Sequence, residues 1–332
     1  MSRGMHDLLR RLRHSRDAGL ALLTALLLLA LAARFSAFRD VASLAGLFDD
    51  TAILILLALG QMLVIVTRGI DLSVAANVAL SGMAVALLNH AHPALPVPLL
   101  VLLATLLGLL LGLCNGLLVW RLGMPPIVVT LGTMAIFRGA VYLLSGGAWV
   151  TSDKMTPAFQ SLMRHTALGL TLLSWLALLA VAMLALWLHY ARTGRRLYMA
   201  GGNPSAAAYL GIEAGRMQCL AFTVSGALAG LCGYLWVTRY AVAYTDVAQG
   251  FELQVIAACV IGGVSVAGGV GTVAGVLLGC LFLGLIRNAL PLAGISPFWQ
   301  MAVSGAVITV AVVLNARRGA QRRRHILEAD AA

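Results

Sequence analysis

The sequence predicts an all-α, polytopic membrane protein of about ten transmembrane helices. Of its 332 residues, 61% are hydrophobic and only 11% are charged, whereas soluble proteins carry about 25% charged residues. Apolar runs of about 17 to 25 residues, the length that crosses a hydrocarbon core as a helix, recur along the chain. The basic residues gather in short clusters beside these runs. Together these observations exclude a soluble globular fold.

Ten runs satisfy the length and hydropathy of a membrane span. The third and eighth are short or interrupted by glycine, so each is expected to be a full span, a re-entrant segment or a broken helix. The predicted spans are 18–36, 51–67, 72–89, 97–119, 126–144, 168–190, 217–237, 252–266, 271–288 and 297–314.

Three arginine clusters predict the topology. They lie in the N-terminal arm, in the loop after the sixth span and in the C-terminal tail, and they account for much of the net charge of +11. With ten spans all three fall on one side, which the positive-inside rule makes cytoplasmic, whereas an odd number of spans would separate the arm from the tail. We therefore expect no nucleic-acid partner and both termini in the cytoplasm. The predicted parts are a basic arm at 1–17, a membrane domain at 18–315 with a cytoplasmic loop at 191–216, and a tail at 316–332.

The first apolar run also has the Arg-rich flank of a signal peptide. It continues through Ala32, Ala33, Arg34 and Phe35 without the small-residue cleavage site that a signal peptide normally carries. We interpret it as a retained first span.

Few residues could support catalysis, metal binding or ion coupling. The only lysine, Lys154, does not follow a glycine-rich turn, so no P-loop for ATP is present, and the five cysteines and seven histidines show no ligand spacing. Asp71 and Glu252 lie near the ends of predicted membrane segments, and no carboxylate lies in the middle of a predicted span. This scarcity weakens an ion-coupled transporter without excluding it. We expect a non-catalytic chain with no metal or cofactor of its own.

Glycines at four-residue spacing predict close helix packing in two spans, because a stripe without side chains lets two backbones approach. The two stripes lie five spans apart, and five is odd, so a duplication would make two halves of opposite topology. Chance recurrence of glycine in apolar sequence is the alternative. The stripes are Gly108, Gly112 and Gly116, and Gly271, Gly275 and Gly279.

The stretch TRGIDLSVAANVALSGM, from Thr67 to Met83, places two polar residues before the third span. Asp71 and Ser73 can cap the helix start, since short polar side chains accept hydrogen bonds from the free N–H groups of a first turn. The functional alternative is that this cap fixes a short or broken helix whose next turns, including Asn77, line a path.

This stretch resembles the permease subunits of the bacterial ABC sugar importers that take up ribose, xylose, rhamnose and the autoinducer-2 sugar. PPIVVTLGTMAIFRG from Pro125, GGNPSAAAYLGI from Gly201 and VIGGVSVAGGVGTVAG from Val260 follow in the family's order, and the resemblance extends from about residue 50 to residue 314. It implies a non-catalytic subunit in the bacterial inner membrane. The partners it implies are a cytoplasmic ABC ATPase that binds ATP and Mg, a periplasmic sugar-binding protein, and a second permease, either another copy or a paralogue.

The resemblance also implies a cytoplasmic coupling helix that inserts into a groove of the ATPase. Its pattern in the family, Glu-Ala-Ala, three residues, then Gly, matches Ser205, Ala206, Ala207 and Gly211. Asn203 is suited to cap this helix, Pro204 to be its first residue and Gly211 to end it. Ser205 departs from the family's Glu and lacks a carboxylate that the helix N-terminus would favour. We therefore expect coupling to depend on shape and on Arg195 and Arg196; an ordinary capped surface helix is the alternative.

Sugar sites combine aromatic faces with amide and hydroxyl groups, and several such residues lie at suitable depth. For each of them a hydrogen bond between helices is the alternative to substrate contact. The candidates for the substrate path are Gln61, Asn77, Asn115, Thr130, Thr133, Arg138, Glu252, Gln254, Trp299 and Gln300.

The cargo is predicted by resemblance alone. FDDTAILI, GYLWVTRYAVAY and SPFWQMAVSG are most similar to the rhamnose permeases of the family. L-rhamnose is therefore the predicted sugar, with ribose, xylose and autoinducer-2 as alternatives.

Overall fold

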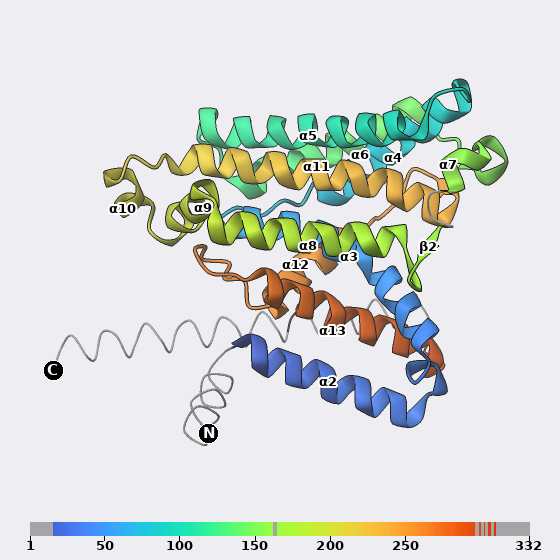
Figure 1. Cartoon of the computed structure of the whole chain (residues 1–332). Helices are drawn as coiled ribbons and strands as arrows, with labels where there is room; N and C mark the ends of the chain where they lie inside the picture. Colours follow the sequence, from blue (N-terminus) through green and yellow to red (C-terminus); the bar gives the residue numbers. More distant parts are fainter. Residues whose placement is uncertain are drawn as a thin grey trace, which may run out of the picture.

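The computed structural model describes residues 16–161 and 165–295, together with residues 299, 302, 305, 306 and 309. Among these residues, eight helices are long and apolar enough to cross a membrane, and they run side by side as one bundle (Figure 1). The predicted all-α polytopic fold is confirmed. The eight are α2 (Arg16–Arg34), α3 (Val41–Val66), α4 (Val74–Ala91), α5 (Val97–Leu122), α6 (Pro126–Ser145), α8 (Leu172–Tyr190), α11 (Ala214–Tyr240) and α13 (Val273–Leu292).

Two predicted spans differ from the structure. α3 begins at Val41 rather than at residue 51, because Asp40 caps it by accepting a hydrogen bond from Ser43 N at 3.0 Å. Asp49 and Asp50 therefore lie within this membrane helix, whereas the sequence predicted that the helix begins after them. The eighth predicted span contains only α12 (Phe251–Ile261), whose 11 residues reach ~16 Å, about half of a hydrocarbon core.

The eighth span is thus a broken helix, one of the alternatives expected for it. The chain continues from α12 as irregular backbone in which Gly263, Gly268 and Gly269 have positive φ, a conformation that glycine adopts without steric cost. The tenth predicted span, 297–314, falls almost entirely outside the described residues.

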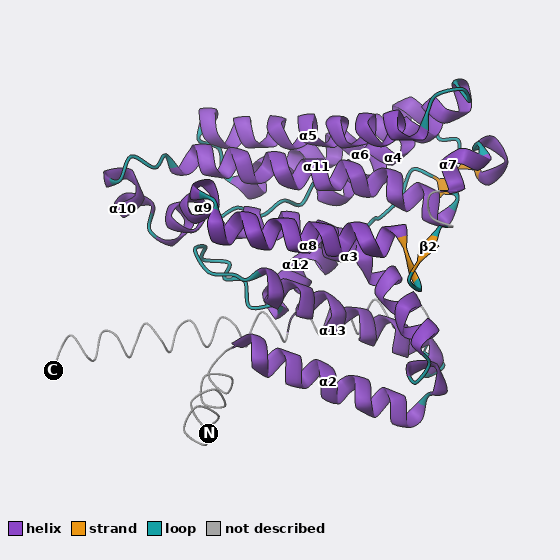
Figure 2. Ribbon diagram, viewed as in Figure 1, coloured by secondary structure: helices purple, strands orange, loops and turns teal. Residues whose placement is uncertain are grey.

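Short elements occupy the two ends of the bundle (Figure 2). One end, here called the outer end, carries two small antiparallel pairs. The opposite end, here called the inner end, carries two short helices next to each other. The outer elements are β1 (Val150–Thr151) paired with β4 (Val242–Ala243), β2 (Thr166–Ala167) paired with β3 (Leu170–Thr171), η1 (Ser36–Phe38), η2 (Ser152–Lys154) and α7 (Pro157–Ser161), and the inner ones are α9 (Arg192–Gly202) and α10 (Pro204–Tyr209).

α3 is the central helix of the bundle. Its most apolar window is 94% buried, whereas the corresponding window of α2 is 6% buried. α3 contacts α8, α11, α12 and α13 along its length. Large apolar side chains such as Leu22, Leu106 and Leu143 point outward from the peripheral helices, as expected where lipid is the solvent.

Both predicted glycine stripes lie in helix contacts. A Cβ on Gly108 or Gly112 of α5 would overlap backbone atoms of α11, and Gly226 of α11 faces the same glycines in return. A Cβ on Gly275 or Gly279 would likewise overlap the backbone of α12 or of the residue after it. Gly271 lies just before α13. The close packing predicted for small residues is therefore confirmed.

The helix contacts also cross between the two halves of the chain. α11 of the second half packs on α4 and α5, while α3 of the first half packs on α12 and α13. This exchange is what an inverted repeat of five spans would produce. The duplication itself stays a hypothesis.

Candidate functional site

The predicted coupling helix is a short helix at the inner end of the bundle. α10 begins at Pro204, and the Asn203 side chain caps it by accepting a hydrogen bond from Ala206 N at 3.0 Å. Gly211 follows the helix with φ +71°, and its N–H donates to Ala208 O at 3.0 Å. The sequence therefore predicted the local structure of this segment correctly, with Gly211 in the left-handed conformation that ends helices.

One face of α10 is buried and the other is exposed. Ala207 packs with Ala200 and Ile212 in a small apolar cluster separate from the main core. Ser205 and Ala206 are exposed, and Tyr209 is 93% exposed. The buried face fixes α10 on the bundle, so the exposed face is free to meet another protein.

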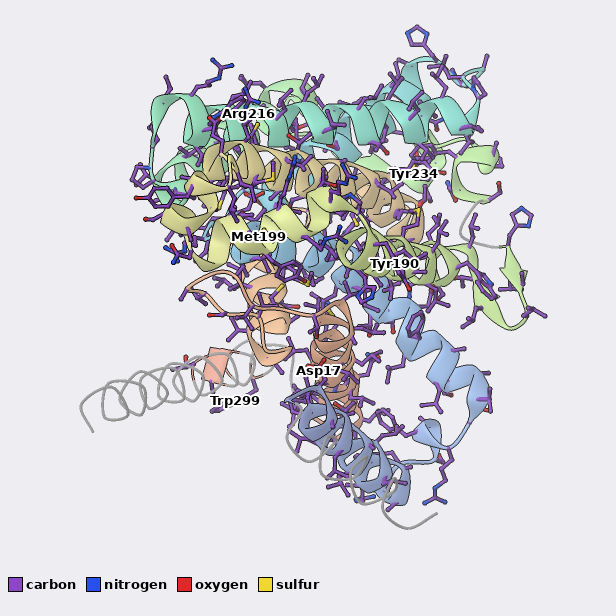
Figure 3. All side chains as sticks on the ribbon, turned by 60° about the vertical axis from the view of Figure 1, so that its left-hand side comes forward. Asp17, Tyr190, Met199, Arg216, Tyr234 and Trp299 are labelled. Carbon is purple, nitrogen blue, oxygen red and sulfur yellow. The ribbon has the colours of Figure 1, made fainter. Side chains whose placement is uncertain are left out.

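The chain on both sides of α10 is tied to membrane helices. After α10, Glu213 accepts a hydrogen bond from Trp120 Nε1 of α5 at 2.5 Å and forms an ion pair with Arg216 at 2.9 Å. The Arg121 and Arg216 guanidinium groups lie 4.4 and 5.4 Å from the Trp120 ring centroid. Figure 3 turns this end toward the viewer, with Met199 of α9 and Arg216 labelled.

The residues before α10 are hydrogen-bonded to Arg68, which lies just after the end of α3. Arg68 donates from Nε to Gly201 O at 2.6 Å and from a terminal nitrogen to Gly202 O at 2.9 Å. The sequence pattern alone assigns no role to Arg68. The available signal was a lone arginine between the end of an apolar helix and a buried aspartate.

Asp71 and Ser73 form a buried turn directly before α4, but the predicted helix cap is wrong, because neither side chain accepts a hydrogen bond from the first turn of α4. The Asp71 carboxylate accepts from Ser73 N at 2.9 Å and from Ser73 Oγ at 2.7 Å. In the amide orientation that satisfies both of its polar atoms, Gln61 pairs with the Asp71 backbone, its nitrogen donating to the carbonyl at 3.3 Å and its oxygen accepting from the N–H at 3.1 Å. Asp71 is 3% exposed, and burial raises the pKa of its carboxyl to about 6, against the lowering effect of the Ser73 hydrogen bonds.

Two further predicted path residues join this turn to neighbouring helices, and a third joins α4 to α5. Asn115 of α5 donates to Ser73 Oγ at 2.8 Å, Thr130 of α6 donates to Ile70 O at 3.1 Å, and Asn77 of α4 donates to Gly108 O at 3.1 Å. All three are buried. Each of these side chains thus takes part in a hydrogen bond between segments, and a role of the three in the substrate path stays a prediction. Asn115 Oδ1 has no hydrogen-bond partner among the described residues.

The other predicted path residues do not join this group. Thr133 lies one turn after Thr130 on α6 and bonds Thr130 O at 3.4 Å. Glu252 and Gln254 are half-buried in α12. Arg138 donates to Thr245 O at 3.2 Å and to Val247 O at 2.7 Å. Trp299 is 67% exposed, and Gln300 lies outside the described residues.

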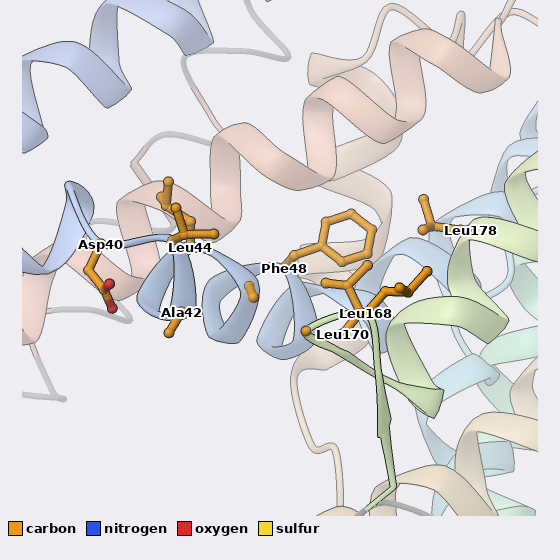
Figure 4. Close-up of a pocket in the computed structure, with 10 residues that line it drawn as sticks. Asp40, Ala42, Leu44, Phe48, Leu168, Leu170 and Leu178 are labelled. Atoms are coloured by element: carbon orange, nitrogen blue, oxygen red, sulfur yellow. The ribbon is translucent and has the colours of Figure 1, made fainter.

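A groove of about 810 Å³ lies at the outer end between the start of α3 and the β2–β3 hairpin (Figure 4). Phe48, Leu168, Leu170 and Leu178 line it, and Asp40 is its one charged lining residue. Among the described residues, none of the predicted path residues lines this groove. Its apolar walls do not suit a sugar.

Comparisons with known proteins agree on the class of this chain. A family model described as "Branched-chain amino acid transport system / permease component" matches residues 43–312. The chain is 37% identical over 289 residues to the autoinducer 2 import system permease protein LsrC of Enterobacter sp. (strain 638), covering 87% of this chain and 83% of that protein. It is 38% identical over 285 residues to the ribose import permease protein RbsC of Bacillus subtilis (strain 168), covering 85% and 87%. No solved structure matches the chain.

Proposed function

The chain belongs to the family of branched-chain amino acid transport system permease components, and we propose that it is the membrane-spanning subunit of an ATP-driven importer of a small sugar. α10 carries this proposal. A short helix with one face fixed on the bundle and the other exposed is suited to receive movement from an ATPase partner. Hydrolysis of ATP with Mg would take place on that partner.

The charges support a cytoplasmic position for the inner end. Arginine is concentrated there, on α9 and at the adjoining ends of membrane helices, whereas most of the described aspartates lie at the outer end. By the positive-inside rule the end that carries α9 and α10 faces the cytoplasm. The inner-end arginines of the described residues are Arg16, Arg68, Arg121, Arg192, Arg195, Arg196 and Arg216.

The residues inside the bundle favour an uncharged cargo. The buried polar side chains that span its helices are mostly amides and hydroxyls, such as Asn77, Asn115 and Thr130. Such groups hydrogen-bond a neutral sugar and supply no counter-ion for the two charges of an amino acid.

Among sugars, ribose and the autoinducer-2 sugar are each supported by the name of a relative, whereas L-rhamnose is supported by motif resemblance alone. All three stay candidates, with xylose behind them. The sugar would be delivered at the outer face by a periplasmic binding protein. It would then pass by alternating access through a pair of permeases, either two copies of this chain or this chain with a paralogue.

One pair of variants tests the role of α10. Gly211→Asp adds a charge to its exposed end, and Gly123→Asp adds the same charge at the end of α5, where φ is +64° and the space around a Cβ is equally open. We expect G211D to abolish sugar uptake at a normal protein level in the membrane, with G123D near the wild type. Uptake unchanged in G211D would remove the coupling role.

A second experiment tests the class of transporter and its cargo. Affinity purification of the chain from its native membrane should recover a P-loop ATPase. Deletion of the gene should then abolish uptake of one labelled sugar among L-rhamnose, D-ribose, D-xylose and autoinducer 2, with labelled leucine as the amino-acid control. Uptake that survives loss of the ATPase and collapses with the ion gradient would identify a secondary transporter instead.

A further inference from the structure

Three segments far apart in the sequence meet at one point of the inner end: the last residues of α3, the last residues of α9, and the irregular segment 262–272. Gly269 N donates to Val66 O at 2.8 Å, and Tyr198 Oη donates to Gly271 O at 2.9 Å. Gln218 of α11 donates to Thr67 O at 2.9 Å. We call this meeting point the inner joint.

Of the hydrogen bonds in the inner joint, the two made by Arg68 lie nearest to α10. Its two hydrogen bonds end on Gly201 and Gly202, whose carbonyls are the last of α9 and find no partner within that helix. A guanidinium group suits this position, because its planar fork carries parallel donors and its charge is favourable at the negative end of a helix dipole. α10 starts two residues after Gly202.

The backbone of Arg68 has a conformation that costs free energy for a residue with a side chain. Arg68 has φ +67°, a region that residues with a side chain rarely occupy. Gly201 is packed so closely that a Cβ would overlap Val66 O, while a Cβ on Gly202 would have its nearest neighbour, Gly269 Cα, at 3.8 Å. The joint therefore requires backbone contact at 201 and a guanidinium group at 68.

From Arg68 the chain continues directly into the buried turn at Asp71. Only Gly69 and Ile70 separate the two, and the turn is bonded to α3 through Gln61, to α5 through Asn115 and to α6 through the Ile70 carbonyl. A displacement of the end of α9 would thus be applied to the residue that begins a short, fully bonded segment. Coupling between distant sites is carried by such contiguous, rigid contacts.

We infer that Arg68 is a positioning residue that transmits the movement of α10 to the 67–73 segment and through it to the helices that enclose the sugar path. This inference rests on the proposed function, since it assumes that an ATPase moves α10. It assigns the transmission to a side chain outside the coupling helix. Arg68 touches neither the sugar nor ATP.

Two substitutions at Arg68 test the transmission. Arg68→Gly removes the guanidinium group and suits the positive φ, so the fold is expected to survive. Arg68→Lys keeps the charge but offers one nitrogen for two carbonyls. The control is Arg192→Ala, which removes an equal charge from the start of α9 and leaves the inner joint intact.

Two quantities are measured for each variant: sugar uptake by cells and ATP hydrolysis by the purified complex. Cells carrying it are given a labelled mixture of L-rhamnose, D-ribose, D-xylose and autoinducer 2, and the complex purified with its ATPase is assayed for ATP hydrolysis in nanodiscs. We expect R68G to lower uptake about tenfold, a common size for allosteric coupling, while the amount of complex and its ATP hydrolysis stay near wild type. R68K should fall between R68G and the wild type, and R192A should transport normally.

Uptake unchanged in both R68G and R68K would overturn the inference, and so would a parallel loss of uptake and assembled complex in R68K, which would show a merely structural role. If R68G alone fails to assemble, R68K decides by the same two readings. A wild-type chain that recovers no ATPase would instead contradict the proposed function.

A glycine pair gives a second route to the same joint. Gly201→Ala forces a methyl group against Val66 O, whereas Gly202→Ala has room for it. We expect G201A to lower uptake at least as much as R68G does, and G202A to transport like the wild type. Equal, normal uptake by both variants would contradict the inner joint as the route of transmission.

Discussion

The two ends of the bundle each bury an aspartate, and they satisfy it in opposite ways. At the outer end Asp49, 6% exposed, forms an ion pair with Arg239 of α11 and accepts hydrogen bonds from Thr171 and from Ser174 Oγ of α8, the latter at 3.1 Å. At the inner end Asp71 is also buried, 3% exposed, and its carboxylate bonds only to Ser73 among the described residues.

The two carboxylates therefore have different structural roles: Asp49 joins helices to one another, whereas Asp71 orders its own turn. The Asp49 carboxylate joins side chains of three membrane helices, so its charge is compensated and the helices α3, α8 and α11 are fixed to one another. The Asp71 carboxylate holds only its own turn, and its neighbours on α3, α5 and α6 bind the backbone or the serine. The outer end is thus held by side-chain charge, and the inner end by hydrogen bonds that centre on a segment of backbone.

The largest loss of stability is expected when Arg239, the cation at the outer end, is removed. Arg239→Ala leaves a buried aspartate without its counter-ion, which should cost about 3–5 kcal/mol of stability. Thermal unfolding in detergent should show a large fall in Tm. Asp50, the other partner of Arg239, has a side chain that is 46% exposed, so Asp50→Asn should cost about 1 kcal/mol or less. Equal effects of R239A and D50N would show that the burial of Asp49 does not matter.

A pH titration sharpens the contrast at the inner end. The folded protein raises the pKa of Asp71 from 3.8 to about 6, so it holds this proton more tightly than the unfolded chain does. The contribution of Asp71 therefore favours the folded state at low pH and is lost as the pH rises from about 4 through about 6, by about 3 kcal/mol in total.

Asp71→Asn should remove this dependence. Melting temperatures of the wild type and D71N between pH 4.5 and 7.5 should differ in slope, with the wild type losing more stability as the pH rises. Asp246→Asn, at an exposed position of the outer end, serves as the control. A D71N slope identical to that of the wild type would refute the raised pKa.

A smaller effect is expected from the amide that holds the inner turn. Gln61→Ala leaves the N–H and C=O groups of Asp71 without their partner in the protein interior, at about 2 kcal/mol. Gln249→Ala, at an exposed position, should be close to neutral. Chemical unfolding at fixed pH compares the two. If Q61A also leaves the stability unchanged, the turn does not depend on the Gln61 amide.

The smallest expected effect lies in the outer cluster. The Thr171 side chain accepts a hydrogen bond from Ser174 N at 3.3 Å and so caps α8. Thr171→Ala should cost about 1 kcal/mol, the usual value for a cap, and Thr166→Ala in the exposed β2 strand should cost less. A loss in T171A as large as that in R239A would show that the hydroxyl, rather than the ion pair, fixes the outer end.

Local patterns made much of this protein predictable. Apolar runs located the eight long helices of the described residues, because membrane length and hydropathy are properties of consecutive residues. Asn203, Pro204 and Gly211 located α10, since caps and left-handed glycines act within one turn. The start of α3 was missed because Asp49 and Asp50 interrupt its apolar run, and only their contacts with Arg239 and α8 make such charges tolerable inside the helix.

The sequence by itself determined the membrane fold, the close-packed glycine faces and the short capped helix α10, all of which follow from composition and short-range spacing. Only the tertiary structure decided the partners of the polar residues. Asn77 and Asn115 bond neighbouring helices, and Arg68 reaches glycines more than a hundred positions away. Such pairings depend on how the helices pack, and no local pattern in the chain encodes them.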